Sequence, residues 1–371
     1  MFDNYNFRKY DIFLVLLCVG LSLTGLVYIN SANSAYVSKQ RTGLILAVAV
    51  MAIVSLISYK FVLKFYWAIY EVAIALLVLV KVFGSQGGGA QRWFEIGGIR
   101  FQPSEVVKIM LILFYAAFIM KHEDTINTVR IIISCVIFII PPALLIFKQP
   151  DLSTTIMVLA IFCVCMFIGG ISYKIIGGAL VIGIPAFVLV LKYLMLDSVH
   201  ILEDYHKDRI LAWLYPEEYS STQAYQTLNA VTAIGSGQLM GKGLDNNVIA
   251  SVKNGNFISE AHTDFIFSIV GEETGFVGCC FVIGLLFLIA VLCIMVGRGA
   301  DDLAGKIIAG GMGGLIFVQS FVNIGVVTGL LPNTGLPLPF VSYGQTSLIS
   351  MFLGIGFVLN VRLQSPDNIV F

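Results

Sequence analysis

The chain has 371 residues, of which 58% are hydrophobic and only 12% are charged, and its mean hydropathy is +0.92. A soluble domain could not cover so much apolar surface with so few charges, so the composition excludes an ordinary soluble protein and indicates an integral membrane protein. The formal net charge is +0 and no basic tract is present, which excludes a nucleic-acid-binding function.

Runs of about 20 apolar residues can each cross a bilayer as a helix, and the sequence predicts about ten of them. They lie at residues 12–31, 43–59, 65–83, 104–120, 130–148, 152–170, 174–194, 265–296, 306–331 and 344–362. The predicted fold class is therefore an all-α polytopic membrane protein, with residues 1–371 in one transmembrane domain. Ala32-Asn33-Ser34-Ala35 resembles a signal-peptide cleavage site, but nine further spans favour a retained first helix.

The loops between these spans set the expected topology. An even number of helices places both termini on one side, and the lysines and arginines of the short loops slightly favour the cytoplasm for that side. Two long polar connections then lie outside, at residues 84–103 and about 195–263, the second between helices seven and eight. Its length indicates a function, and its stretch from Asp208 to Trp213 fits an interfacial helix.

Three ionisable side chains, those of Glu260, His262 and Asp264, stand directly before the apolar span that begins at Phe265. An acid at a membrane boundary is costly unless it pairs, is hydrated or reacts. Asp264 is therefore the candidate catalytic residue. The alternative is structural: Asp264 begins the helix and caps its N-terminus.

Charged pairs also occur at the predicted outer ends of other spans. Glu105 and Lys108 are spaced i,i+3, so they could neutralise each other as a buried pair that locks their helix. Lys148 and Asp151 flank the tight connection that contains Pro150. This arrangement suits either a turn or a clamp for a polar ligand.

Two outer loops offer further binding groups. Arg92, in a glycine-rich loop, could bind a phosphate with two parallel hydrogen bonds, or it could be an interfacial arginine that extends to the headgroups. The stretch Asn333–Gly344 contains two prolines and two glycines, which prevent regular helix. Unwound backbone at membrane depth must be buried by protein or line a wet cavity, which favours the wall of a substrate cavity over a plain rigid turn.

Several motifs occur in a fixed order over about 270 residues. They are Arg92-Trp93, Gln102-Pro103-Ser104-Glu105, Lys148-Gln149-Pro150-Asp151, Ala233 to Gly237, Gly241-Lys242-Gly243, Glu260 to Phe267, Gly271-Glu272-Glu273 and Thr334 to Gly344. In these motifs the chain resembles the SEDS family (shape, elongation, division and sporulation), the RodA/FtsW/SpoVE-type membrane glycosyltransferases of bacterial wall synthesis. It departs from the family pattern at Ile258-Ser259, Asn229-Ala230 and Gln345 to Ser347, which concerns loop geometry and substrate detail.

The resemblance implies a multi-pass protein of the bacterial cytoplasmic membrane that polymerises lipid II into glycan strands at the outer face. It also implies a class B penicillin-binding protein as the transpeptidase partner. The catalytic aspartate of the family falls on Asp264. Its cavity-lining polar positions fall on Arg92, Glu105, Lys108, Lys148, Asp151, His262, Ser342 and Tyr343, which we expect to bind substrate. Glu260, in the cluster before Asp264, is predicted to bind substrate as well.

The expected mechanism has Asp264 as the general base that takes a proton from the 4-hydroxyl of the incoming sugar of lipid II. Arg92, Lys148 or a bound divalent cation (Mg or Mn) would stabilise the departing pyrophosphate of the lipid-linked glycan. Two alternatives remain: a lipid II flippase, which should bind its ligand near the midplane of the membrane, and a noncatalytic scaffold for a wall synthase. The motifs do not separate elongation, division and sporulation.

Overall fold

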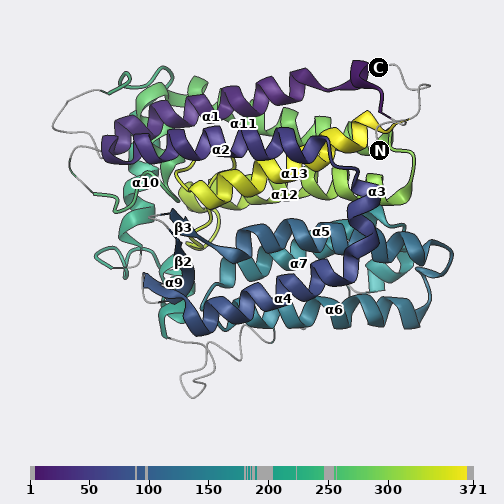
Figure 1. Cartoon of the computed structure of the whole chain (residues 1–371). Coiled ribbons are helices and arrows are strands. Elements are labelled where there is room, and N and C mark those ends of the chain that lie inside the picture. Colours follow the sequence, from purple (N-terminus) through teal and green to yellow (C-terminus); the bar gives the residue numbers. More distant parts are fainter. Residues whose placement is uncertain are drawn as a thin grey trace.

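The computed structural model of the chain describes residues 5–87, 90–96, 99–178, 204–222, 224–245 and 257–365, with the single positions 181, 183, 185, 189 and 255. The long helices run side by side in one bundle (Figure 1). Both termini lie at one end of this bundle, where the Asn6 N–H donates to the Leu363 carbonyl at 3.0 Å. The short strands, α9 and α10 lie at the opposite end, which also carries the candidate site.

Eight helical segments in the described part of the chain are long and apolar enough to cross a membrane. They are α1 (Ile12–Ala32), η2 with α2 (Ser34–Tyr36, Val37–Ser55), α3, η3 and α4 (Tyr59–Val62, Leu63–Phe65, Tyr66–Phe83), α5 (Pro103–Lys121), α6 (Val129–Phe147), α11 (Ile266–Arg298), α12 (Leu303–Val327) and α13 (Gln345–Leu363). Between α6 and α11, α7 (Leu152–Ile168) is apolar but shorter, and η1 (Phe7–Lys9) and η4 (Glu123–Thr125) are single turns.

The predicted all-α polytopic fold is confirmed. α2 begins at Val37, six residues before the predicted start at residue 43. The prediction began too late because the first turns of α2 contain Lys39, Gln40 and Arg41, which are not apolar. The predicted span 174–194 lies mostly outside the described residues. The count of ten helices and the position of the large loop therefore stay predictions.

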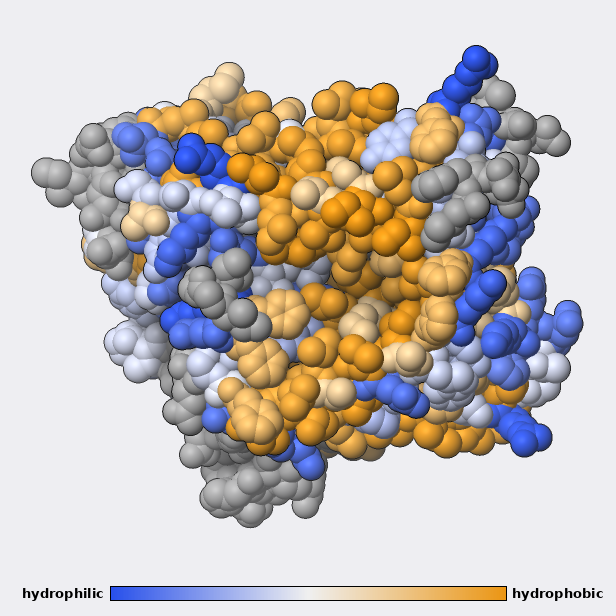
Figure 2. Space-filling model, viewed as in Figure 1, coloured by the Kyte–Doolittle hydropathy of each residue, from blue (hydrophilic) through white to orange (hydrophobic). Residues whose placement is uncertain are grey.

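The surface of the bundle is divided by polarity. Figure 2 shows hydrophobic side chains in a broad band across the middle of the visible face and hydrophilic side chains at the two ends. Large apolar side chains such as Leu16 on α1 and Val82 on α4 are well exposed. Exposed apolar side chains in a band between polar ends suit the hydrocarbon core of a bilayer.

The predicted outer connection 84–103 contains a small sheet that the sequence analysis missed. β1 (Ser85–Gly87), β2 (Ala90–Ile96) and β3 (Ile99–Phe101) pair antiparallel in the order β1-β2-β3. Ser85 faces Trp93, and Phe94 faces Phe101. Strand pairing satisfies backbone groups that would otherwise need water at the membrane rim, and it holds Arg92 on the central strand.

The long connection before α11 contains α9 (Asp204–Leu214) and α10 (Tyr225–Ser236). The helix predicted around Asp208–Trp213 is confirmed as α9, and the Trp213 indole N–H donates to the Gly329 carbonyl at 3.2 Å. α10 packs against α11. Gly275, at φ +64°, interrupts α11 so that the Phe276 N–H can bond to the Gln238 carbonyl at 2.8 Å.

Close packing between α1 and the loop before α13 yields a test of the fold. A Cβ added at Gly25 would lie 2.6 Å from the Val341 carbonyl oxygen and 2.8 Å from its Cα, so the loop would have to move. Gly25→Ala should lower the free energy of unfolding by about 1–3 kcal/mol. Gly20→Ala is the matched control, because no heavy atom lies within 4 Å of that added Cβ.

The measurement is the thermal unfolding midpoint of both purified variants in the same detergent. The Gly25 variant should unfold at a lower temperature than wild type and the Gly20 variant should not. Equal midpoints for the two variants would contradict the packing described here.

Candidate active site

Asp264 stands just outside the membrane-spanning helix rather than at its cap. α11 begins at Ile266, its N-cap is Phe265, and no side-chain hydrogen bond caps it. The interpretation of Asp264 as the first residue and cap of this helix is therefore wrong. Its side chain is partly exposed, and no described residue donates a hydrogen bond to the carboxylate.

The backbone at Asp264 is held by an amide from α12. The Asn323 side-chain amide donates to the Asp264 carbonyl at 2.7 Å and to the Leu336 carbonyl at 2.6 Å. It therefore joins the start of α11 to the loop 333–344. Within that loop Gly335 adopts φ +75°, and an added Cβ would lie 3.1 Å from the Asp264 carboxylate. The loop thus passes directly beside the carboxylate.

The environment of Asp264 shifts its acidity toward neutral pH. Burial raises the pKa of its carboxyl group from 3.8 to about 6. The nearby charge of Arg209 opposes this rise, those of Asp151 and Glu260 add to it, and Arg92 opposes it. A carboxylate that ionises just below neutral pH and accepts no internal hydrogen bond is suited to act as a general base.

Arg92 and the turn before α7 form one unit next to this carboxylate. The Arg92 side chain donates from Nε to the Gln149 carbonyl at 2.8 Å and from a terminal nitrogen to the Pro150 carbonyl. Its Nη1 lies 3.8 Å from Asp151 Oδ2. Asp151 also caps α7, because its Oδ1 accepts the Thr154 N–H at 3.0 Å. The turn and the charged cluster are thus the same structure.

Lys148 occupies a different environment from its neighbours in this turn. It is the C-cap residue of α6, its side chain is exposed, and no acidic side chain in the described part of the chain pairs with it. It therefore remains available for an anionic ligand.

Glu105 and Lys108 lie in the interior. Lys108 Nζ is 2.8 Å from Glu105 Oε1 and 2.9 Å from Gln319 Oε1, and Lys108 is 0% exposed. The Gln319 amide in turn donates to the Pro337 carbonyl at 2.9 Å. The pair therefore locks α5 to α12 and supports the loop 333–344, as the structural alternative from the sequence expects.

His262 and Tyr343 belong to an aromatic cluster with Tyr36, and His262 lies two residues before Asp264 in the chain. The buried His262 ring stacks on Tyr36 with 4.2 Å between ring centroids. Burial lowers the pKa of His262, and the nearby Glu260 carboxylate, 3.4 Å from Nε2, partly opposes this effect. Tyr343 donates its backbone N–H to the His262 carbonyl at 2.9 Å, and burial raises the pKa of its phenol. Glu260 itself is exposed.

Ser342 is committed to holding the loop. Its hydroxyl donates to the Thr263 carbonyl at 2.6 Å and accepts the Leu338 N–H at 2.7 Å. The Gln40 amide of α2 reaches the Ser342 carbonyl at 3.2 Å. The residue directly before Asp264 is therefore fixed to the same loop that Asn323 holds.

The structure brings Asp264, Arg92, Asp151 and Glu260 into one electrostatic environment and adds Arg209 to it. Sequence reasoning missed Arg209, Gln319 and Asn323. The last two are polar residues spaced i,i+4 within an apolar span, a pattern that marks buried polar contacts in membrane helices. Arg209 lies in the stretch predicted as an interfacial helix. The sequence of that stretch does not indicate that the Arg209 charge acts on Asp264.

The carboxylates near Asp264 could hold a cation only if a bound ligand supplied some of the oxygen atoms that coordinate it. No group of three or more His, Cys, Asp or Glu side chains capable of holding a metal occurs among the residues described. The Asp151 carboxylate lies in the charged cluster, where its Oδ1 accepts the Thr154 N–H at 3.0 Å and its Oδ2 lies 3.8 Å from Arg92 Nη1. Mg²⁺ is commonly held by one or two carboxylates together with phosphate oxygens and water. Asp151 could contribute one carboxylate to a site of that kind, with the remaining ligands supplied by a phosphate-bearing substrate and water.

Comparison with protein families and curated proteins gives consistent matches. The family model described as cell cycle protein, for FtsW, RodA and SpoVE, matches residues 8–366. The peptidoglycan glycosyltransferase MrdB of Escherichia coli strain K12 is 37% identical over 298 residues, covering 80% of this chain and 78% of that protein. The probable peptidoglycan glycosyltransferase FtsW of Bacillus subtilis strain 168 is 32% identical over 383 residues, covering 98% and 92%.

Solved structures are similar over nearly the whole chain. A chain from a study of how a peptidoglycan synthase complex coordinates polymerization and crosslinking superposes with a TM-score of 0.79 and 28% identity, covering 95% of this chain and 97% of that one. The rod shape determining protein RodA of Thermus thermophilus gives a TM-score of 0.69 and 27% identity, covering 95% and 96%.

The raised pKa of Asp264 predicts a pH-dependent stability difference. The folded state binds this proton more tightly than the unfolded state, so wild type should lose stability as pH rises from near 3.8 to about 6. Asp264→Asn removes this loss. The unfolding midpoint of the variant relative to wild type should therefore rise through this window and level off above it.

Glu123→Gln, at an exposed acid near the other end of the bundle, is the control and should show no such trend. Thermal unfolding of the three purified proteins across this pH range measures the effect. A difference between the Asp264 variant and wild type that does not change with pH would contradict the described environment.

Proposed function

We propose that this chain polymerises lipid II with Asp264 as its general base. The chain belongs to the FtsW, RodA and SpoVE family of cell cycle proteins and is a peptidoglycan glycosyltransferase of the membrane. One observation carries the assignment of the base. The Asp264 carboxylate is partly exposed, accepts no hydrogen bond from the described residues, and has a pKa of about 6. A base of that kind is mostly ionised at neutral pH yet basic enough to accept a proton in the transition state.

The reaction joins two lipid-linked sugars. The 4-hydroxyl oxygen of the incoming lipid II sugar attacks the anomeric carbon of the growing glycan, and Asp264 takes the hydroxyl proton. The bond from that carbon to the pyrophosphate oxygen breaks, and the lipid pyrophosphate leaves with the electron pair. Arg92 and Arg209, whose charges already act on Asp264, would stabilise the leaving group together with the exposed Lys148.

The remaining polar residues would keep these groups in place. Glu105 and Lys108 act through Gln319 on the loop 333–344, and Ser342 fixes the backbone next to Asp264. Their role is to position the loop and the base. His262 and Tyr343 would form the aromatic side of the site, against which a sugar ring can pack.

A divalent cation, Mg²⁺ or Mn²⁺, is also part of the proposal. When bound, it would neutralise charge on the pyrophosphate. Asp151 is the residue that would hold it, with the phosphate oxygens of the substrate completing the site. The structural support is the position of Asp151, whose Oδ2 lies 3.8 Å from Arg92 Nη1 in the cluster whose charges act on Asp264.

We infer that the end of the bundle with Asp264, β2 and α9 faces outward and that the termini are cytoplasmic. Glycan must be assembled where it can be crosslinked, which places the base on the outer side. We also infer a class B penicillin-binding protein as the partner that supplies transpeptidation. The similarity to a chain of a peptidoglycan synthase complex that polymerises and crosslinks supports this.

Replacement of the proposed base tests the function. Asp264→Asn should lower polymerisation by at least about a hundredfold, the smaller end of the contribution of a general base, while the protein remains folded. The assay is glycan formed from lipid II by the purified protein with its transpeptidase partner. Asp124→Asn makes the same change at an exposed acid near the other end and should keep full activity.

Full polymerisation by the Asp264 variant would refute the base. If wild type moved lipid II across vesicles without forming glycan, the flippase alternative would be favoured instead. If it did neither and served only to recruit its partner, the scaffold alternative would hold.

Removal of metal tests the cation separately. Exhaustive chelation should abolish most polymerisation, and added Mg²⁺ or Mn²⁺ should restore it. The same assay measures this effect. Activity unchanged by chelation would remove the cation from the proposal and leave the role of Asp264 intact.

A further inference from the structure

A polar and aromatic cavity lies at the end of the bundle opposite Asp264. Its volume is about 650 Å³, and it is formed where α4 begins, α5 ends and α6 begins. The same end carries both termini (Figure 1). It therefore shares no residue with the candidate active site.

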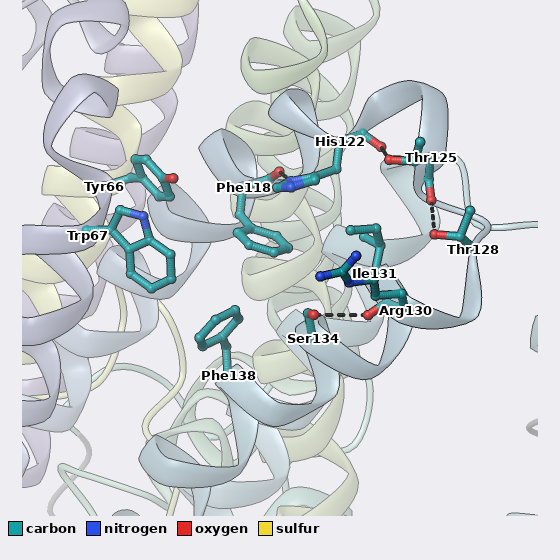
Figure 3. Close-up of a pocket in the computed structure, with 10 residues that line it drawn as sticks. All are labelled: Tyr66, Trp67, Phe118, His122, Thr125, Thr128, Arg130, Ile131, Ser134 and Phe138. Carbon is teal, nitrogen blue, oxygen red and sulfur yellow. Dashed lines mark hydrogen bonds between the residues drawn. The ribbon is translucent and has the colours of Figure 1, made fainter.

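The two sides of this cavity differ in chemistry. One wall is aromatic and apolar, and the other is polar, with an arginine, a histidine and three hydroxyl groups (Figure 3). The aromatic wall consists of Tyr66, Trp67, Phe118 and Phe138, and Ile131 lies beside Arg130 on the other side. The polar wall consists of His122, Thr125, Thr128, Arg130 and Ser134. Such a division suits a ligand with an apolar chain and a polar head.

Arg130 sets the charge of that head. In Figure 3 its guanidinium points into the cavity toward the aromatic side chains. No acidic side chain in the described part of the chain pairs with it. Glu123 and Asp124, the acids of the adjoining turn, are exposed and do not line the cavity. A guanidinium carries five hydrogen-bond donors and no acceptor, so it favours an anionic oxygen ligand.

The neighbouring groups add to this preference. Lys121 places its Nζ 4.3 Å from the Tyr66 ring centroid, which brings a second cation to the edge of the cavity. The hydroxyls of Thr125, Thr128 and Ser134 already donate to backbone carbonyls, so they fix the polar wall rather than compete for the guanidinium. The cavity is therefore net positive on its polar side.

The depth of the cavity indicates where such an anion comes from. α5 and α6 each have 19 residues, about 28 Å of helix at 1.5 Å per residue. This length matches the hydrocarbon core, so the helix ends reach the headgroup region. Trp67, 41% exposed, lies at that level, as tryptophans of membrane interfaces do. A phosphate at Arg130 would be the headgroup of a lipid whose chain runs along the aromatic wall.

We propose that this cavity binds an anionic phospholipid from the leaflet on the side of the termini, with the phosphate on Arg130 and an acyl chain against Trp67, Phe118 and Phe138. The proposal does not depend on the reaction at Asp264. It adds a lipid site at the face of the membrane opposite the site of catalysis.

Trp67 provides a local probe of this site. Trp93 and Trp213 lie in β2 and α9, at the other end of the bundle. In a Trp93→Phe, Trp213→Phe protein reconstituted into bilayers, Trp67 fluorescence should be quenched more by brominated phosphatidylglycerol than by brominated phosphatidylcholine. Arg130→Gln should lower this preference by about fivefold, the factor expected for one basic side chain at an anionic surface.

Arg8→Gln is the matched control, because Arg8 is an exposed arginine at the same end and does not line the cavity. It should keep the preference. If the double tryptophan variant fails to fold, the number of phosphatidylglycerol molecules that survive detergent exchange on otherwise wild-type protein, with and without Arg130→Gln, gives the same comparison. An equal preference in the Arg130 and Arg8 variants would overturn the proposal.

Free inorganic phosphate distinguishes the source of the anion. It should not displace the lipid at millimolar concentration, because it lacks the contacts along the aromatic wall. If inorganic phosphate alters Trp67 emission while the two brominated lipids quench equally, the site takes a soluble phosphate and the lipid proposal is wrong.

Discussion

The double hydrogen bond from Asn323 holds the candidate site together. A single amide on α12 donates to the carbonyls of Asp264 and Leu336, and so fixes the start of α11 to an unwound loop. Neither carbonyl accepts another hydrogen bond from the described residues, and a buried polar group without a partner is costly. Because the loop is fixed beside it, the Asp264 carboxylate stays half-buried without an internal donor, and burial then raises its pKa.

A buried polar chain supports the same loop from below. Glu105, Lys108 and Gln319 form consecutive hydrogen bonds that end at the Pro337 carbonyl. Removing one member would leave a charge or amide unsatisfied in the interior, which costs more than the net gain of the intact contact. Ser342 and Gln40 hold the far end of the loop. The charged positions of the family motifs thus fall into two groups: those next to the carboxylate and those that hold the loop.

Hydropathy was enough to predict the membrane fold and the approximate limits of most helices, because each span must be continuously apolar. It could not predict the strands that carry Arg92, since they lie in a short polar connection where strand pairing depends on contacts with neighbouring residues. The acidic cluster and its position before α11 were visible in the sequence. The start of the helix at Ile266 could not be predicted, because an aspartate that caps a helix and one that lies just before it give the same sequence pattern. Arg209 could not be found from the sequence for a different reason. Its contact with the Asn333 carbonyl and its electrostatic effect on Asp264 join segments far apart in the chain.

The central claim is that Asp264 must be ionised for glycan transfer. The most direct test is the pH dependence of kcat/KM for lipid II polymerisation by the wild-type protein. The rate should rise with pH to a plateau with an apparent pKa of about 6. Near pH 5 it should be about tenfold below that plateau, because only about a tenth of such a base is then ionised. A rate that stays constant from about pH 5 to neutrality would contradict a catalytic carboxylate with this environment.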